Sequence, residues 1–317
     1  MIRGATDEGM KITIGIPVYN CERWIGETIR SALDQTWPEK EVLVIDDGST
    51  DNTVSICRSF GSKIRFVSQG KLGGNAARNH VLRLAGSDWI QFVDADDYLG
   101  PEKIAKQLAA GVTSDADVIC SPVIFEKWEK DRVVSRDPQV FDTPIDWYSN
   151  WIRWNMPQTG GCLWRRESLL RIGGWNESFT CNQEYELYFR AFQSGLRFKW
   201  VDAPEAVYRL WSEDTVCRKD KRAVIKGKTQ LIRQFLEWLH STGNFRPEYK
   251  RLAGVACFEM ARTLATQNLQ QAKEYYAARR REGLMSVDGP AAPWKYRLTL
   301  TCFGFSAAEQ VARAVRH

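Results

Sequence analysis

The first hundred residues alternate between short apolar runs and segments with helical periodicity. The apolar runs, which we expect to form strands, are residues 11–18, 41–45, 64–67 and 89–93. The segments between them, which we expect to form helices, are residues 22–36, a stretch that starts near Ser49 or Thr50, and residues 75–85. Strands that alternate with helices predict βαβ units and a mostly parallel sheet of the α/β class. In such sheets, ligands bind beyond the carboxyl ends of the strands.

Acidic residues follow two of these predicted strands. Asp47 comes after the second strand, and Asp94, Asp96 and Asp97 come directly after the fourth. If the strands are neighbours, their carboxylates converge on one crevice. Crowded carboxylates repel one another unless a cation or a solvent-facing turn relieves the repulsion. A magnesium or manganese ion that also holds a diphosphate is one interpretation, and a polar turn is the other.

The glycine-rich loops that usually bind phosphate are missing from the expected place. The chain after the first strand reads Pro-Val-Tyr-Asn-Cys-Glu, which does not match the G-x-G-x-x-G fingerprint of nicotinamide and flavin enzymes. No G-x-x-x-x-G-K-[ST] loop occurs in the sequence either. An acid-lined crevice of this kind must therefore recruit phosphate through a metal ion or through basic side chains such as Arg78.

Two long stretches and a looser third resemble family 2 glycosyltransferases, which are inverting enzymes of GT-A fold that use nucleoside-diphosphate sugars. The stretches are IPVYNCERWIGETIRSALDQTWPEKEVLVIDDGSTDNT, GGNAARNHVLRLAGSDWIQFVDADD and, less closely, GCLWRRESLLRIGGWNESF with NQEYELYFRAFQSG. They fall within residues 11–210 in the order and at the spacing expected of the family. The resemblance implies a Rossmann-like, nucleotide-sugar-binding GT-A domain with a mostly parallel central sheet.

The resemblance also implies roles for single residues. Seven residues occupy positions that bind the donor nucleotide in the family: Pro17, Tyr19, Glu22, Asp47, Arg78, Asp94 and Asp96. Of these, Asp47 is expected to meet the base, usually uracil, and Asp94 the ribose. Asp96 is expected to hold Mn²⁺ or Mg²⁺, with Asp97 as a further acid at the metal. The structural alternatives are a helix cap for Asp47, packing for Tyr19 and a surface helix position for Arg78.

The catalytic base departs from the family pattern. Relatives carry a Glu-Asp pair at the start of a helix after a Gly-Gly-aromatic segment, whereas this chain reads Gln183-Glu184 at that place. Glutamate has the same acid–base chemistry as aspartate with one more methylene, so Glu184 is the predicted base. The alternative is a first-turn acid that is favoured by the helix dipole. Gln183 and Trp175 are predicted to lie on the acceptor side, and Glu186 is a weaker candidate for the base.

Composition limits the remaining function classes. The net charge is +5, from 44 basic and 39 acidic residues, which gives no nucleic-acid signature. Eight cysteines without C-x-x-C spacing argue against a zinc site. Because the N-terminus lacks a secretory signal, we expect reduced thiols and a cytoplasmic protein, either free or peripheral on the inner face of the membrane. No stretch approaches the ~20 apolar residues of a spanning helix, and the Q-x-x-R-W motif of processive synthases is missing, which favours single additions.

We expect three parts along the chain. Residues 1–10 are predicted to be a flexible N-terminus, residues 11–215 a GT-A domain, and residues 216–317 a basic, helical extension. Within the GT-A domain, residues 11–100 form the donor half and residues 101–215 the acceptor half. The acceptor half holds a cluster of tryptophans that would either stack on sugar rings or fill the core: Trp147, Trp151, Trp154, Trp164 and Trp175.

The C-terminal extension leaves several interpretations open. Residues 223–282 are predicted to be helical throughout, and a Ser306–Glu309 capping box is predicted to start a last helix. A basic run opens the extension: Arg218, Lys219, Lys221, Arg222, Lys226 and Lys228. This run would cover a diphosphate, contact anionic lipid or form a solvated helix face. The aromatic and basic tail suits peripheral membrane contact, homodimerisation or packing on the catalytic domain.

Taken together, the sequence predicts an inverting, metal-dependent transferase that moves a sugar from a nucleotide-sugar donor, most plausibly a UDP-sugar, to a saccharide or lipid-linked acceptor. The expected pathway is surface polysaccharide or glycoconjugate assembly. The alternatives are a polyprenyl-phosphate sugar synthase and a catalytically inactive nucleotide-sugar-binding subunit. At position 211, where relatives often carry a metal-binding histidine, this chain has a tryptophan, which casts doubt on a metal ligand from that loop.

Overall fold

The computed structural model describes residues 9–111, 115–211 and 221–315. The chain divides into two compact units, which are residues 1–141 with 157–213 and residues 142–156 with 214–317. We call them the first and the second unit. The division after residue 213 falls close to the predicted boundary at 215/216, but the sequence did not predict that residues 142–156 join the second unit. The predicted flexible residues 1–8, and Arg218 and Lys219 of the basic run, lie outside the described residues.

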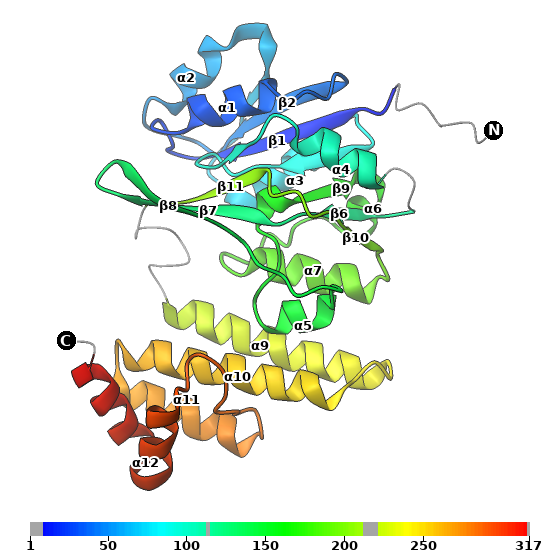
Figure 1. Ribbon diagram of the computed structural model, residues 1–317. Helices are drawn as coiled ribbons and strands as arrows, with labels where there is room; N and C mark the ends of the chain where they lie inside the picture. Colours follow the sequence, from blue (N-terminus) through cyan, green and yellow to red (C-terminus); the bar gives the residue numbers. More distant parts are fainter. Residues whose placement is uncertain (1–8, 112–114, 212–220, 316–317) are drawn as a thin grey trace. The chain divides into compact units, whose positions relative to one another are not determined.

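The first unit is built on a seven-stranded, mostly parallel sheet, as predicted (Figure 1). The strand order is β10-β6-β9-β4-β1-β2-β3. β1 pairs in parallel with β2 and β4, β2 with β3, and β6 with β10, whereas β9 runs antiparallel to β4 and β6. The strands are β1 (Ile12–Val18), β2 (Lys40–Asp46), β3 (Arg65–Ser68), β4 (Trp89–Phe92), β6 (Val118–Cys120), β9 (Cys162–Arg165) and β10 (Phe198–Trp200).

β1 is an interior strand of this sheet, and both of its faces are covered. All seven of its residues are buried, as expected for a parallel strand with helices on either side. Ile12 and Ile14 pack with Ile25 and Ile29 of α1 in one core cluster. On the other face, Gly15 lies so close to α3 that an added Cβ would stand 2.4 Å from Val81. α1 and α3 therefore cover opposite faces of the sheet.

A second sheet of four strands extends the first unit. Its order is β5-β11-β7-β8, with β11 antiparallel to β5 and parallel to β7. This pairing brings β11 next to the acidic residues that precede β5, although more than a hundred residues separate the two in the chain. The strands are β5 (Tyr98–Leu99), β7 (Val123–Glu129), β8 (Arg132–Pro138) and β11 (Ala206–Leu210).

The helices expected within residues 22–36 and 75–85 and at Gln183-Glu184 are present, whereas those at residues 103–111 and 166–171 were not predicted. The helices of the first unit are α1 (Ile25–Leu33), α2 (Thr53–Ser59), α3 (Gly74–Leu84), α4 (Lys103–Gly111), α6 (Arg166–Arg171) and α7 (Gln183–Gln193), with 3₁₀ turns at Gly61–Lys63 and Thr159–Gly161. The prediction that α2 starts near Ser49 or Thr50 was wrong. Both hydroxyls bond to Asn20, at 2.9 and 3.3 Å, so they hold the loop after β1 instead of capping a helix.

The second unit is helical in its described part. Its helices are α5 (Trp147–Ile152), α9 (Lys221–Ser241), α10 (Pro247–Ala265), α11 (Leu269–Arg281) and α12 (Trp294–Val315). The prediction of continuous helix over residues 223–282 was wrong, because the chain leaves helical geometry at residues 242–246 and 266–268. In the core of this unit, the ring of Trp151 stacks on Phe235 with centroids 4.1 Å apart.

α12 consists of two helical segments, and the second begins close to the predicted Ser306–Glu309 capping box. α12 starts at Trp294 and is interrupted at Gly304, whose φ of 79° is a conformation that favours glycine. The carboxylate of Glu309 accepts hydrogen bonds from Arg262 Nε at 2.8 Å and from Tyr296 OH at 2.6 Å. Glu309 therefore ties α12 to α10, a role that local sequence does not reveal. Within the described ranges, no helix is both long enough and apolar enough to span a bilayer.

Candidate active site

The carboxyl ends of β4, β1 and β2 lie side by side, because these strands are adjacent and parallel. Asp47 follows β2, and its amide donates to the carbonyl of Val18 at the end of β1, at 2.8 Å. Asp94 and Asp96 lie in the loop that follows β4. The acids after β2 and β4 therefore share one edge of the sheet, as the sequence predicted.

The buried carboxylate of Asp47 fixes the segment that leads into α3. Its Oδ1 accepts from the amide of Leu72 and from Gln69 Nε2, both at 2.8 Å, and its Oδ2 accepts from the amide of Gly73 at 2.9 Å. Gly73 has a φ of 101°, which favours glycine and lets the chain turn into the helix. Asp47 thus has a structural role, and its contact with a nucleobase stays a prediction.

The segment that Asp47 anchors places Lys71 next to Tyr19. The Lys71 ammonium donates to the Tyr19 hydroxyl at 2.7 Å and lies 4.3 Å from the ring centroid. The Tyr19 side chain is 41% exposed, so its ring borders the crevice and is not part of the core. Sequence reasoning missed Lys71; the available signal was a basic residue inside the glycine-containing stretch SQGKLGG.

Two of the predicted donor-binding residues have mainly structural contacts. Pro17 is buried within β1, opposite Ile45 of β2. The exposed Glu22 accepts hydrogen bonds from the amide and the side chain of Asn52, each at 2.9 Å, and so holds the start of α2. Their contact with a nucleotide remains untested.

Arg78 and Asp94 form a buried ion pair. The guanidinium of Arg78, on α3, contacts Asp94 Oδ1 at 2.6 Å, and it lies 4.8 Å from the ring centroid of Trp175. Burial opposes the charge of Arg78, but the neighbouring Asp94 and Glu184 raise its pKa, so the cation is retained. Arg78 is therefore part of the acidic cluster, and the surface-position alternative was wrong.

Asp96 and Asp97 are both held by the chain around β11. Oδ2 of Asp96 accepts a 2.9 Å hydrogen bond from the indole nitrogen of Trp211, and Oδ1 of Asp97 accepts from the amide of Arg209 at 2.8 Å. Burial raises the pKa of Asp96, and the nearby Asp94 raises it further. Burial likewise raises the pKa of Asp97 well above its usual value, with Asp96 and Asp94 adding to the effect.

Arg209, which the sequence places in the Tyr-Arg segment before Trp211 without a role of its own, is a neighbour of the acidic loop. Its buried guanidinium donates to the carbonyl of Asp96 at 2.9 Å and forms ion pairs with Glu27 at 2.7 Å and Glu126 at 3.6 Å. The signal was an arginine within the strand sequence AVYRL, because a buried charge requires carboxylate partners. The adjacent Tyr208 faces the same cluster: burial, followed by Asp97 and Asp94, raises its pKa.

The acidic loop has the chemistry of a hard-cation site. Carboxylates whose pKa values are raised by burial and by one another are stabilised when a divalent cation neutralises their charge. In the part of the chain that the structure describes, no group of three or more metal-binding side chains converges on one point.

Glu184 lies in the first turn of α7 and faces this cluster. Its Oε1 accepts from the hydroxyl of Thr159 at 3.1 Å and from the side-chain amide of Gln183 at 3.3 Å. Burial raises the pKa of Glu184; Arg78 counteracts the rise and Asp94 adds to it. By contrast, Glu186 is tied to Arg190 at 2.7 Å. Glu184, and not Glu186, therefore has the environment of a tuned acid–base group.

Trp175 is enclosed where the sequence predicted an acceptor-side residue. It is 3% exposed, and its ring meets Phe92 edge to face at 5.7 Å, while Arg78 lies over it. Little of the ring remains for a sugar to stack on, so these contacts favour the core-packing alternative. Gln183 lies half-buried beside Glu184, and its contact with an acceptor is not tested by these distances.

The tryptophans of the predicted acceptor half are divided between the two units. Trp147, Trp151 and Trp154 belong to the second unit, whereas Trp164 and Trp175 belong to the first. Trp151 and Trp164 are 0% and 3% exposed. Core filling accounts for these two side chains, in line with the packing alternative.

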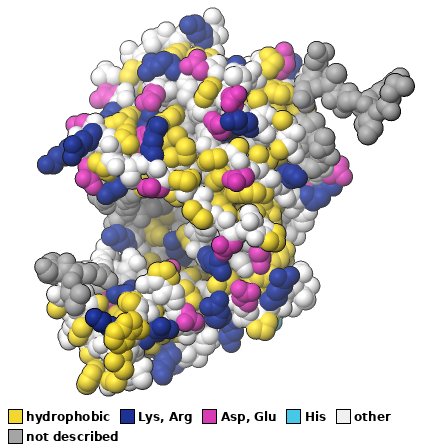
Figure 2. All heavy atoms as spheres, in the orientation of Figure 1, with side chains coloured by type: hydrophobic (Ala, Val, Ile, Leu, Met, Phe, Trp, Pro, Cys, Tyr) yellow, Lys and Arg dark blue, Asp and Glu magenta, His cyan; other side chains and the backbone are white. Residues whose placement is uncertain are grey.

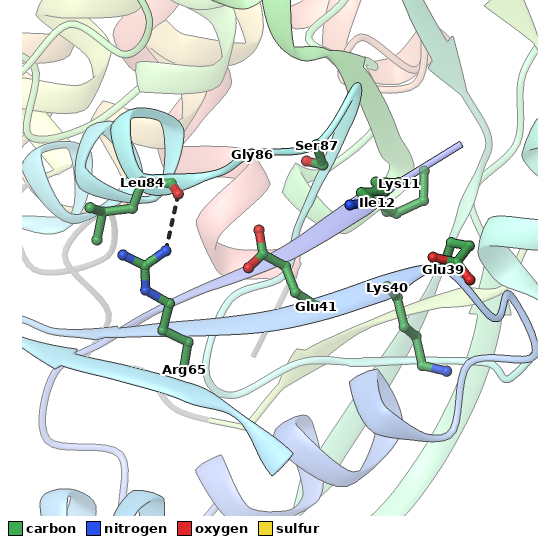
Figure 3. A pocket seen from close by; sticks show the side chains of 9 residues that line it. All are labelled: Lys11, Ile12, Glu39, Lys40, Glu41, Arg65, Leu84, Gly86 and Ser87. Atoms are coloured by element: carbon green, nitrogen blue, oxygen red, sulfur yellow. Dashed lines mark hydrogen bonds between the residues drawn. The ribbon is translucent and has the colours of Figure 1, made fainter. Parts of the chain in front are cut away.

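A separate hollow lies at the opposite edge of the sheet, near the amino ends of β1, β2 and β3 (Figure 3). Its volume is about 370 Å³, and charges of both signs line it, including Lys11, Glu41 and Arg65. The guanidinium of Arg65 donates to the carbonyl of Leu84 at 3.2 Å. Because ligands of parallel sheets bind at the carboxyl ends of the strands, this hollow is not the candidate active site.

Comparisons with known proteins agree with the architecture. A family model described as glycosyl transferase family 2 matches residues 13–173. Chondroitin synthase of Escherichia coli is 29% identical over 193 residues, which are 58% of this chain and 27% of that protein. Poly(ribitol-phosphate) beta-glucosyltransferase of Bacillus spizizenii is 36% identical over 118 residues, 34% of this chain and 18% of that protein. The matched region thus spans less than a third of the length of these relatives.

Two solved structures share the fold over nearly the whole chain. TarS residues 1–349 of S. aureus, in complex with UDP-GlcNAc, superposes with a TM-score of 0.66 at 17% identity, covering 97% of this chain and 92% of that chain. The mannosyltransferase PcManGT of Pyrobaculum calidifontis, in complex with GDP-Man and Mn²⁺, gives a TM-score of 0.51 at 18% identity, covering 96% and 86%. At these identities the likeness establishes the GT-A fold.

Proposed function

Because this chain belongs to glycosyltransferase family 2, we propose that it transfers a sugar from a nucleoside-diphosphate sugar to an acceptor hydroxyl with inversion at the anomeric carbon. One observation carries the proposal. The edge of the sheet that holds Asp47 also holds the Arg78–Asp94 ion pair, and the charges of this pair act on Glu184.

The donor occupies the crevice beyond β1, β2 and β4 in this proposal. Tyr19 and Asp47 border the nucleoside, and Asp94, held by Arg78, meets the ribose. A uridine nucleotide is the favoured donor, and the structural relative TarS, which was solved with UDP-GlcNAc, supports this choice through its shared fold. Arg78 also supplies a positive charge near the diphosphate, because its side chain is the buried cation of the cluster.

Asp96 holds Mn²⁺ or Mg²⁺ in this proposal, with Asp97 behind it. When bound, the cation neutralises the negative charge that grows on the departing nucleoside diphosphate. Asp97 supports the cation site without direct contact in this proposal, because its Oδ1 already accepts a hydrogen bond from the amide of Arg209. Trp211 donates to Oδ2 of Asp96, so the proposal assigns the cation to Oδ1.

Glu184 takes the proton from the acceptor hydroxyl. The hydroxyl oxygen then attacks the anomeric carbon from the side opposite the diphosphate, the bond from that carbon to the diphosphate oxygen breaks, and the configuration inverts. The raised pKa of Glu184 suits this role, because a base with a pKa closer to the working pH accepts a proton more effectively. Thr159 and Gln183 orient the carboxylate through the hydrogen bonds to its Oε1.

The acceptor is a saccharide of surface polysaccharide or glycoconjugate assembly in the main proposal, and a polyprenyl phosphate in the second. The surface of α12 favours a lipid-linked acceptor. Figure 2 shows hydrophobic side chains gathered where α12 lies, and Trp294 and Leu298, one helical turn apart, are 64% and 58% exposed. Lys295 and Arg297 flank them, a combination that is typical of interfacial membrane contact. Homodimerisation through the same face is the competing interpretation.

Substitution of the base tests the transferase proposal. Glu184→Gln is expected to lower turnover of a UDP-sugar by about 10²–10⁴-fold while UDP binding is kept. Glu167→Gln, on the exposed side of α6, is the matched control and is expected to retain full activity. If the wild-type protein binds UDP but transfers no sugar to saccharide or polyprenyl-phosphate acceptors, the inactive-subunit alternative replaces the proposal.

A further inference from the structure

A groove in the second unit runs between α9 and α11, and its lining contains none of the residues assigned to catalysis. Its volume is about 470 Å³, and Ile225 and Leu264 are the apolar residues that line it. Four basic side chains line it as well, Arg222, Lys226 and Arg233 from α9 and Arg279 from α11. Against these four, the lining contains the single carboxylate of Glu274. The groove is therefore strongly cationic.

The positive charge of the groove is only partly compensated within the unit. Arg233 and Arg279 share one carboxylate, that of Glu282; Arg279 contacts it at 2.6 Å, and Arg233 Nε lies 3.2 Å from its second oxygen. Two guanidinium groups on one carboxylate leave an excess positive charge. Because the Arg279 side chain is 11% exposed, water compensates little of this excess.

Arg279 also has an unsatisfied donor. Its Nε is buried and finds no hydrogen-bond partner among the described residues. A buried donor without an acceptor is costly and is uncommon in native proteins, so such a group calls for a bound partner. An anion in the groove would neutralise part of the charge that Arg233 and Arg279 share.

The neutral lining of the groove fits an oxyanion. Gln230 and Gln271 supply amide groups, and the hydroxyls of Thr229 and Tyr275 lie 2.8 Å apart at its wall. Lys226 is exposed, and its ammonium has no hydrogen-bond or ion-pair partner in the described part of the chain. Guanidinium forks, amides and an ammonium are the groups that proteins use to hold phosphate.

We propose that this groove is a binding site for a phosphate group, carried either by a phosphodiester or phosphomonoester in solution or by a lipid headgroup. Arg279 and Arg233 hold the phosphate oxygens, and Lys226 adds a charge at the open end. The site is distinct from the diphosphate site of the donor, and its test does not depend on sugar transfer because the readout is binding.

The experiment measures binding of inorganic phosphate to the full chain by calorimetry. Saturable binding is expected, and Arg279→Gln is expected to weaken it about tenfold, as for the loss of a hydrogen bond to a charged group. Lys226→Gln is expected to weaken it about two- to fivefold, in keeping with an exposed charge pair. The control Lys273→Gln removes an exposed charge on α11 outside the groove and is expected to change nothing. Unfolding midpoints of all variants show whether a loss of binding reflects a loss of folding.

Two further arms separate the sources of phosphate. Glycerophosphoglycerol in solution and vesicles of phosphatidylglycerol, with phosphatidylcholine vesicles as the blank, are compared in the wild type and in Lys226→Gln. Binding of either probe that weakens in Lys226→Gln supports the site and identifies the source. Absence of saturable binding to all probes, or an equal loss in Lys273→Gln, would overturn the proposal, because it would show that the cations of this groove are not organised as a site.

Discussion

The indole nitrogen of Trp211 donates a 2.9 Å hydrogen bond to Oδ2 of Asp96. The two residues are 115 positions apart in the chain, and the pairing of β11 with β5 brings them together. The ring of Trp211 also meets Trp24 at 5.7 Å, edge to face. Asp96 is therefore oriented by an aromatic residue whose ring is itself packed against Trp24.

Replacing Trp211 tests whether this orientation matters for cation binding. Outer-sphere hydrogen bonds to a ligating carboxylate typically contribute 10–100-fold to metal affinity, so Trp211→Phe is expected to weaken Mn²⁺ binding by about tenfold. Electron paramagnetic resonance of free Mn²⁺ measures the affinity without any need for activity. Trp294→Phe, an exposed position in the second unit, is the control. If Asp96→Asn abolishes Mn²⁺ binding while Trp211→Phe leaves it unchanged, the role of Trp211 is refuted and that of Asp96 stands.

The ion pair of Arg78 and Asp94 is expected to stabilise the first unit as well as the site. Arg78→Met leaves a partly buried carboxylate without its cation, which should lower the free energy of unfolding by about 3 kcal/mol. Denaturant titration measures this loss. The double variant Arg78→Met/Asp94→Asn should be more stable than Arg78→Met alone, because the unpaired charge is gone. A double variant that is less stable than the single one would contradict the account.

We expect Asp47 to hold the segment that carries Lys71 in its folded conformation. Asp47→Asn removes the charge and at least one of the three acceptor contacts, at a cost of about 2 kcal/mol. The equilibrium constant for local opening of this segment should therefore rise more than tenfold, and the rate of trypsin cleavage after Lys71 should rise by a similar factor. Asp34→Asn, an exposed position at the end of α1, serves as the control. Unchanged cleavage would show that other contacts hold this segment.

The raised pKa of Glu184 predicts opposite effects on activity and stability. Activity should rise with pH through the pKa of Glu184 in the folded protein, because the base must be ionised. The free energy of unfolding should change in the other direction and fall with pH. Folding favours the protonated form of Glu184, so its ionisation costs stability as the pH rises through the pKa of the folded protein. Glu184→Gln should therefore be inactive yet more stable than the wild type at neutral pH. This gain should vanish below the ordinary pKa of a glutamate, and a gain that persists at acid pH would exclude this explanation.

Lys103 offers a second test of buried charge. It is 1% exposed, its ammonium contacts the side-chain oxygens of Gln91 and Gln107, and burial lowers its pKa to about 7. Between this value and the ordinary pKa of 10.5, the unfolded chain binds the extra proton, so stability rises with pH across that window. The free energy of unfolding of the wild type, relative to Lys103→Met, should increase by up to about 1.4 kcal/mol per pH unit above pH 7. A difference that does not change with pH would refute the assignment.

Local periodicity was sufficient to predict the first half of the sheet. β1, β2 and β4 appear where β-branched and apolar runs end in acids, and the helices that cover β1 follow their apolar stripes. The start of α2 was missed because Ser49 and Thr50 bond to Asn20, a contact between two loops. Capping rules consider only nearby residues and do not register such a contact.

The contacts of the site that sequence reasoning missed all depend on distant partners. Arg209 and Trp211 reach the acidic loop through the second sheet, whose strands are short and come from separate parts of the chain. Trp175 was placed correctly before the helix of Glu184, but its enclosure by Phe92 and Arg78 is a tertiary effect. Composition indicated that tryptophans gather in this region, but it does not tell which of them are buried.

The central claim is that the edge formed by Asp47 and Asp96 binds a nucleoside diphosphate together with a divalent cation. Calorimetric titration of UDP, with and without Mn²⁺, into the wild type and Asp96→Asn tests it most directly. The account predicts tight UDP binding that requires Mn²⁺ in the wild type and is lost in Asp96→Asn. UDP binding that is equal in all four titrations, or a preference for NAD or ATP over UDP, would contradict it.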